Sequence, residues 1–435
     1  MPQGVRIGCG AGFAGDRLEP AVDLVERGAL DTLVLECLGE RTVSLASLRA
    51  TDGSGPGYDP LLRRRLALLL EPLARRGTRL VTNAGAADPV GAARMAHELA
   101  RELEVSPRIA AVTGDDVLDR IDRSAPAWED GRPLESHGEL VSANAYLGAE
   151  ALLPALADGA DIVIAGRAAD PSLFLAPLLD TLGWDPRDEG LLAAGSLTGH
   201  LLECAGQVTG GYFADPGLKD VPDLANLGFP LAEVAPNGSA VLTKNPGTGG
   251  RVDRMTVTEQ LTYEVTDPAA YLTPDVTLDM TGVRLAETGA DRVRVSGARG
   301  RARPDRLKAS VGYRAGFRGE GEISYAGPGA RARARLAGEV VRERLAGRVP
   351  VRVDVIGGAD TPDEVGECRL RVAGAAPDRV GAEAVEEEVG ALYTCGPAGG
   401  GGVRTRSTEV IGILSTTVGR DLVEPRTTYF GEGAK

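Results

Sequence analysis

The chain has 435 residues, of which 43% are hydrophobic and 25% are charged, and its formal net charge at pH 7 is −14. This composition is that of a globular protein, the length favours more than one domain, and no apolar run approaches the roughly 18 residues of a membrane-spanning helix. The net negative charge opposes binding to nucleic acid and to anionic membranes, and no basic helix offsets it. We therefore expect neither nucleic acid nor membrane as a partner.

The cysteines and the N-terminal segment bear on the cellular compartment. There are five cysteines, an odd number, and no CxxC pair, which argues against a disulfide framework and against a structural zinc site. The segment MPQGVRIGCG enters a strand-like run directly and lacks the charged and apolar regions of a signal peptide. We therefore expect reduced thiols, no metal site and a cytoplasmic protein.

The first half of the chain alternates short apolar runs with amphipathic segments. The predicted strands are VRIGC (5–9), DTLVLEC (31–37), TRLVTNAG (78–85), RIAAVTG (108–114), GELVSANAY (138–146) and DIVIAG (161–166). Helices are predicted over 19–28, 59–77 and 88–104. This alternation predicts an α/β fold with a mostly parallel sheet, doubly wound in our preferred interpretation and a barrel in the alternative. Ligands bind such sheets at the carboxyl ends of the strands, which here are rich in Gly, Asn and Asp.

After about residue 225 the pattern changes to strands that follow one another across turns. Strands are predicted over 239–245, 255–265, 275–285, 290–298, 307–315, 349–358 and 367–374, and helices over 330–347 and 379–396. We expect an α+β region with antiparallel strands. The predicted domains are 1–225, an α/β domain that carries the site; 226–344, an extension that completes it; and 345–435, a small α+β domain.

The segment GAGFAG matches the dinucleotide-binding pattern G-x-G-x-x-G through Gly10, Gly12 and Gly15, and Glu36 ends the next strand as a ribose-binding acid would. Two details weaken this interpretation. Asp16 adds negative charge where a pyrophosphate needs positive potential, and Pro20 indicates a later helix start. A tight turn is the alternative, so we do not expect a nicotinamide cofactor, although the loop can still bind an anion.

Two other strand ends carry polar residues that suit substrate binding. TNAGAADP supplies Asn83, and GRAADPS supplies Arg167 and Asp170; an arginine there can pair with a carboxylate or phosphate. Asp88 and Asp170 each precede a proline, which is typical of helix N-caps, and capping is our preferred interpretation for both.

The segment GHLLECAGQVTGGYF contains one of only three histidines. If residues 198–208 are helical, one face carries His200, Glu203, Cys204 and Gln207. His200 and Glu203 then suit acid–base catalysis, and Gln207 and Tyr212 suit substrate binding. The alternative is a polar stripe packed at a domain boundary.

Two glycine-rich segments in the second half, KNPGTGGR and CGPAGGGGVRTR, are predicted to be loops with basic residues. Backbone amides of such loops can hold an anionic group such as that of coenzyme A, and we select Gly400, Gly401 and Arg404 for this role. A flexible loop without a ligand is the alternative.

Several of these segments together, among them GAGFAGDR, TNAGAADP, GRAADPS, GHLLECAGQVTGGYFAD and LKASVGYRAGFRGEGEISYAG, resemble the acyclic terpene utilisation (AtuA-like) family over nearly the whole chain. The resemblance implies acyclic monoterpene or acid metabolism through coenzyme A thioesters, and a smaller C-terminal α+β region. It implies no catalytic residues, so the residues above are our own selection.

We expect an enzyme of the hydratase, dehydratase, lyase or isomerase type that acts on a small acyl or carboxylate metabolite and forms homo-oligomers. His200 and Glu203 are the acid–base candidates, with Asn83 and Arg167 as substrate anchors. The first alternative is a non-catalytic subunit that supports a partner enzyme, because no nucleophile or metal cluster is evident. The second is an NAD(P)-dependent oxidoreductase.

Overall fold

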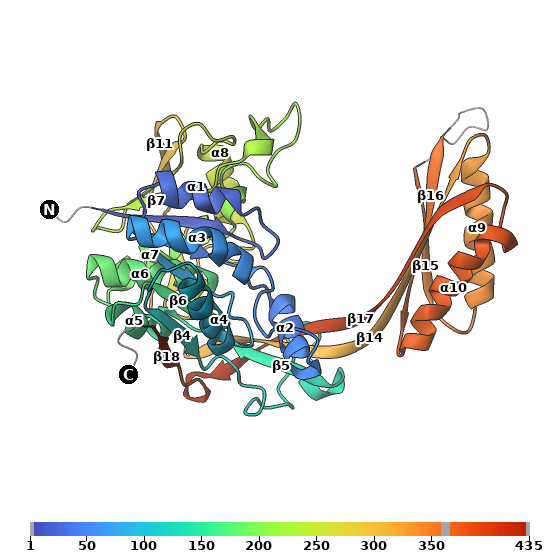
Figure 1. Cartoon of the computed structure of the whole chain (residues 1–435), viewed down its shortest axis with the longest axis horizontal. Helices are drawn as coiled ribbons and strands as arrows, with labels where there is room; N and C mark the ends of the chain where they lie inside the picture. The colour runs from blue at the N-terminus through green and yellow to red at the C-terminus, as the bar shows by residue number, and fades with distance from the viewer. Residues whose placement is uncertain (1–3, 358–365, 432–435) are drawn as a thin grey trace. The chain divides into compact units, whose positions relative to one another are not determined.

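The computed structural model describes residues 4–357 and 366–431. It contains ten α-helices within these ranges, together with large sheets, one of them with parallel strand pairs (Figure 1), so the prediction of a mixed α/β protein is confirmed. No helix in this part of the chain combines the length and the apolar character needed to cross a membrane. The chain divides into two compact units: Met1–Pro133 with Val141–Val311 and Leu414–Lys435, and Leu134–Leu140 with Gly312–Ile413.

The larger unit is built on a ten-stranded sheet in the order β11-β12-β8-β7-β1-β2-β3-β6-β4-β18. Its five central strands are parallel: β1 (Val5–Ala11), β2 (Thr32–Leu35), β3 (Arg79–Thr82), β6 (Ile162–Ala165) and β4 (Ile109–Thr113). Antiparallel strands extend it on both sides: β7 (Pro230–Val234), β8 (Ala240–Lys244), β12 (Arg292–Ser296), β11 (Arg284–Gly289) and β18 (Arg426–Phe430). The sheet is therefore mixed, rather than mostly parallel as predicted. The carboxyl ends of the five parallel strands meet at one edge.

Helices cover both faces of this sheet. Along β1, Gly8 and Gly10 lie against Leu24 and Ala21 of α1, whereas the thiol of Cys9 points the other way, to the backbone at the end of α7. One group of mutually packed helices is α1 (Glu19–Arg27), α3 (Leu62–Arg76) and α4 (Pro89–Glu102). The other group is α5 (Ala149–Ala157), α6 (Asp170–Leu182) and α7 (Glu189–Leu202). The helices α6 and α7 follow each other directly along the chain, whereas β6 lies between α5 and α6.

Two predicted strands of this unit differ in the structure. The segment 138–146 forms β5 (Leu140–Ala145), but it pairs with β14 (Arg306–Ala326) and not with the parallel strands. The segment 255–265 is mostly helix α8 (Arg254–Thr262), not a strand. Its start is fixed by a capping box, in which Asp253 accepts from the Thr256 amide and the Thr256 hydroxyl accepts from the Asp253 amide. A further helix, α2 (Glu40–Asp52), follows β2, and a small sheet contains β9 (Tyr271–Leu272), β10 (Thr277–Asp279) and β13 (Arg299–Arg301).

The smaller unit is an antiparallel sheet with two helices. The strand order is β15-β16-β14-β17, with β15 (Val351–Gly357), β16 (Glu367–Ala376) and β17 (Gly400–Gly419), and the helices are α9 (Ala330–Leu345) and α10 (Arg379–Cys395). Its core lies between the sheet and the two helices and contains buried side chains such as Ile323, Val341, Val372 and Val385. The predicted boundary at residue 345 coincides with the last residue of α9, and β14 and β17 contribute residues to both units. Short 3-10 helices complete the chain: η1 (Leu134–Ser136), η2 (Ala205–Gln207), η3 (Leu224–Asn226) and η4 (Arg420–Leu422).

Candidate functional site

Arg167 organises the polar groups at the carboxyl ends of the parallel strands. It follows β6 and is only 1% exposed. Its guanidinium donates to the Leu38 carbonyl and pairs with the carboxylate of Asp170, and its backbone amide donates to Asp115 at 2.9 Å. The guanidinium also lies 4.3 Å from the ring centre of Tyr146. Within the described part of the chain its buried Nε has no hydrogen-bond partner, so one donor of this cation remains for a ligand or a water molecule.

The two aspartates that were expected to cap helices behave differently. Asp88 does cap α4, because its Oδ1 accepts from the Gly91 amide at 2.8 Å. Asp170 does not cap α6; Ala169 occupies the N-cap position and Asp170 is the first helical residue. The nearby guanidinium of Arg167 attracts the carboxylate away from the helix amides. Asp170 is therefore placed at the site edge, where its side chain is 34% exposed.

Asn83 and Glu36 form a fixed pair at the ends of β3 and β2. The Asn83 side chain donates from Nδ2 to Glu36 Oε1 at 2.9 Å and accepts the Cys37 amide at 2.8 Å, and it is completely buried. Its amide group thus positions the segment after β2 and is not open to a substrate. Burial and the negative charge of Asp170 raise the pKa of Glu36 to about 8. Glu36 lies in this cluster, not in the ribose-binding role that the glycine pattern suggested.

Four residues that we did not select from the sequence complete the edge of the cluster. The Tyr146 hydroxyl donates to Glu40 Oε1 at 2.6 Å, Lys308 Nζ lies 3.1 Å from the same oxygen, and Ser310 Oγ lies 3.2 Å from the hydroxyl. Burial opposes ionisation of Glu40, but the hydrogen bond from Tyr146 and the charge of Lys308 lower its pKa to about 2. Two features of the sequence pointed here: Glu40 belongs to a strand end, ECLGE, and Lys308 is one of only four lysines.

His200 and Glu203 form a buried pair at the end of α7. His200 Nδ1 lies 2.9 Å from Glu203 Oε1, and His200 Nε2 lies 3.3 Å from the Leu261 carbonyl. Burial raises the pKa of Glu203 to about 7. Burial acts against the charged form of His200, but the adjacent carboxylate outweighs it and raises the pKa of His200. Glu203 Oε2 is buried and has no hydrogen-bond partner among the residues that the structure describes, so one carboxylate oxygen of the pair is available to a ligand.

The predicted helix over 198–208 ends early. The helix α7 stops at Leu202. The Gln260 side chain donates a hydrogen bond to the His200 carbonyl at 3.1 Å, and Ala205 adopts a φ of 42°. The expected common face therefore exists only for His200 and Glu203. Gln207 is half-buried at the end of η2, and Tyr212 is 89% exposed. Burial and the charge of Glu203 raise the pKa of Cys204, which disfavours a thiolate nucleophile.

Other atoms of the protein occupy the space next to the three glycines of GAGFAG. A Cβ on Gly12 would lie 2.4 Å from the Cys204 carbonyl carbon, and one on Gly10 would lie 2.8 Å from Leu35. A Cβ on Gly15 would lie 2.5 Å from the Phe13 ring. The Gly12 amide already donates to Asp16 at 2.8 Å. These residues do not fit a pyrophosphate group; the loop serves the close approach of β1 to the end of α7.

The second glycine run is part of a strand and not a loop. Gly400 and Gly401 begin β17, which pairs with β14 in the smaller unit, and a Cβ on Gly400 would meet Ile323. Arg404 is an exposed residue of the same strand. The pairing of β17 uses backbone groups that a loop would have offered to an anion.

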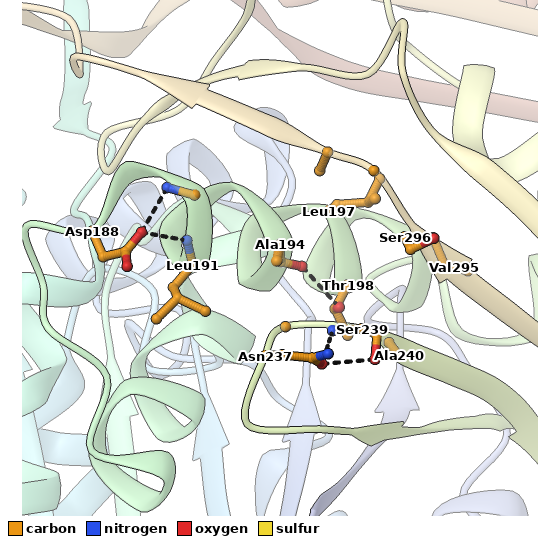
Figure 2. A pocket seen from close by; sticks show the side chains of 14 residues that line it. Asp188, Leu191, Ala194, Leu197, Thr198, Asn237, Ser239, Ala240, Val295 and Ser296 are labelled. Atoms are coloured by element: carbon orange, nitrogen blue, oxygen red, sulfur yellow. Dashed lines mark hydrogen bonds between the residues drawn. The ribbon is translucent and has the colours of Figure 1, made fainter.

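Among the described residues, a cavity of about 390 Å³ lies away from this chemistry. Asp188, Thr198, Asn237, Ser239 and Ser296 supply its polar groups (Figure 2). Asp188 caps α7 by accepting the Gly190 and Leu191 amides at 3.0 and 3.1 Å. Thr198 donates to the Ala194 carbonyl. Most polar side chains of this cavity are thus bound to nearby protein groups, and we place the candidate site at the strand ends instead.

Within the described ranges, no three His, Cys, Asp or Glu side chains are grouped so that they could bind a metal ion. No curated protein matches the chain significantly. A family model, that of the acyclic terpene utilisation family protein AtuA, matches residues 5–429. The match covers nearly the whole chain, and the chain belongs to this family.

Proposed function

We propose that this member of the acyclic terpene utilisation family is an enzyme that transfers protons on a small acyl or carboxylate metabolite. The observation that carries the proposal is the buried pair of His200 and Glu203, in which Oε2 of the glutamate has no partner. The reaction is of the hydratase, dehydratase, lyase or isomerase type, because a positioned base that accepts and returns a proton serves each of these reactions.

The pair has the properties of a general base near neutral pH. The pKa of Glu203 is about 7 and that of His200 is raised, so the pair takes up and releases a proton near neutral pH. Oε2 accepts a proton from the substrate while Oε1 stays bound to the imidazole. Burial keeps water from competing for the carboxylate.

Substrate binding is assigned to the groups next to this pair. Arg167 has one unpartnered donor and holds Asp170 at the edge of the site. We propose that these two residues orient the acyl group, and that Gln207 and Tyr212 contact the rest of the substrate. We propose a coenzyme A thioester as the form of the substrate, in line with the expectation from the sequence. The cytoplasmic location and the homo-oligomer stay predictions.

Deuterium exchange tests the proposal without knowledge of the product. The protein is incubated in D₂O with a panel of short branched and acyclic isoprenoid acids and their coenzyme A thioesters, and mass spectrometry measures deuterium uptake. We expect uptake with at least one member of the panel, and a decrease of about 100-fold or more for Glu203→Gln and His200→Gln. His97→Gln and Glu98→Gln on α4 are matched controls with the same chemical changes elsewhere.

Equal uptake by Glu203→Gln and the wild type would refute the role of the pair. No uptake with any member of the panel would refute the proposed function and favour the non-catalytic subunit. That alternative predicts a stable hetero-complex on purification from the native host.

A further inference from the structure

Glu36 is a buried acid whose two oxygens are in different situations. Its backbone amide donates to the Ala11 carbonyl at 2.8 Å, which fixes it to the last residue of β1. Oε1 accepts both the Leu38 amide at 2.8 Å and Asn83 Nδ2 at 2.9 Å. Among the described residues, Oε2 makes no hydrogen bond. This division suits a neutral carboxyl group, in which the carbonyl oxygen accepts and the hydroxyl is free to donate.

The surroundings of Glu36 also favour the neutral form. The charged and titratable groups that face it are Asp170 and Arg167 from the β6–α6 connection, Cys9 on β1, Cys37 after β2 and Cys204 after α7. Arg167, the cation among them, is bound to Asp170 and to the Leu38 carbonyl, and it forms no ion pair with Glu36. Burial and the charge of Asp170 therefore prevail and raise the pKa of Glu36 to about 8.

Glu36 and Glu203 both lie next to the end of β1. Glu36 follows β2, and Glu203 follows α7, whose end packs on Gly12 next to the end of β1. Asp170 acts electrostatically on both glutamates, and Cys204 is affected by both. A small acyl group beside Asp170 would thus be near both glutamates.

We propose that Glu36 is a second catalytic residue, which donates a proton from Oε2 to the acyl oxygen while Glu203 removes a proton from carbon. This assignment rests on the proposed function. In the step, Glu203 Oε2 takes the proton from the carbon next to the acyl carbonyl, and the electron pair of the broken C–H bond forms the C=C bond of an enol. The carbonyl oxygen takes the proton of Glu36. Glu36 ends the step as a carboxylate and Glu203 as an acid, so protons and charge balance.

The test uses Glu36→Gln in the deuterium-exchange assay, with the panel member that the wild type exchanges fastest. Glutamine keeps the acceptor for Leu38 and Asn83 but has no acidic proton. We expect exchange to fall about 100-fold or more. We also expect wild-type exchange to fall as the pH rises above about 8, where Glu36 loses its proton. Glu98→Gln, an exposed glutamate on α4, is the matched control.

A second measurement does not depend on turnover. Carbon-13 NMR of protein labelled at the glutamate carboxyls locates the Glu36 resonance by its absence in Glu36→Gln, and a pH titration then gives its midpoint. We expect a midpoint near 8; a midpoint near the ordinary 4.5 would overturn the assignment.

The outcomes separate the two proposals. If the wild type exchanges protons and Glu36→Gln does so at the same rate, the role of Glu36 is refuted and that of Glu203 stands. If the wild type exchanges with no member of the panel, the proposed function fails and the catalytic role of Glu36 fails with it.

Discussion

Replacing Glu36 by glutamine should stabilise the protein, and the gain should grow with pH. In the unfolded chain Glu36 loses its proton near the ordinary pKa of 4.5, whereas in the folded protein it keeps it until about 8. Between these values the folded state binds more protons than the unfolded state. The free energy of unfolding therefore falls as the pH rises through this window. Glutamine does not ionise, so the free energy of unfolding of Glu36→Gln does not fall for this reason.

The magnitude follows from the two pKa values. One pKa unit corresponds to about 1.4 kcal/mol, so ionising Glu36 in the folded protein costs on the order of 5 kcal/mol above pH 8. Relaxation around the charge, together with the coupling to Asp170, reduces the measured value, and we take roughly 2 kcal/mol as the smallest difference compatible with this reasoning. Near pH 4 the two proteins should unfold with nearly equal free energies.

Urea denaturation of the wild type and Glu36→Gln at pH 4.5, 6, 7.5 and 9 measures this difference. Comparison at each pH cancels the titration of distant groups, which both proteins share. Glu40→Gln is a matched control with the opposite sign. The pKa of Glu40 is lowered to about 2, so its charge stabilises the fold, by about 1 kcal/mol or less because its side chain is 42% exposed. A Glu36→Gln difference that is constant with pH, or that shrinks as the pH rises, would refute the argument.

Two further substitutions test how the site is held. Gly12→Ala places a methyl group 2.4 Å from the Cys204 carbonyl carbon and should lower the free energy of unfolding by about 1–3 kcal/mol. Gly39→Ala, where the nearest atom would be 3.6 Å away, should cost less than about 1 kcal/mol, and urea denaturation compares the two. Arg65→Met should cost about 3–5 kcal/mol, because it leaves the buried carboxylate of Asp59, 3.9 Å from Arg65 Nε, without its cation. In the same assay, addition of Asp59→Asn should recover part of that loss, and no recovery would argue against the ion pair.

The sequence predicted the parallel strands well because their apolar runs are fully buried and their helices are strongly amphipathic. The polar residues at the strand ends were also predicted to share one edge, which is where Asn83, Arg167 and Asp170 lie. The sequence could not show how these groups divide the hydrogen bonds among themselves. The Asn83 side chain donates a hydrogen bond to Glu36. Asp170 forms an ion pair with Arg167 and does not cap the helix amides.

One local contact and two long-range contacts explain the other differences. The segment 255–265 is rich in β-branched residues, which favour a strand, but the Asp253 capping box makes it the helix α8. The glycine run at 400–402 has the composition of a loop, yet it pairs with β14. Helix α7 ends at Leu202 because Gln260, 60 residues after His200, donates a hydrogen bond to the His200 carbonyl in the last turn of the helix. The partners in the last two cases are far apart in sequence, whereas the capping box lies within the segment's own first turn.

The contrast between Asn83 and Glu36 bears on why this edge of the sheet contains acids. Asn83 is buried and makes two hydrogen bonds, and an amide suffices for that task. Glu36 beside it also makes two hydrogen bonds, both through one oxygen, and an amide would make them equally well. A glutamine there would avoid a cost of several kcal/mol at neutral to basic pH. Since packing and hydrogen bonding do not require the acid, what distinguishes it from the amide is the proton it can give up. Destabilising groups of this kind are typical of functional sites, and this supports the role of Glu36 in proton transfer.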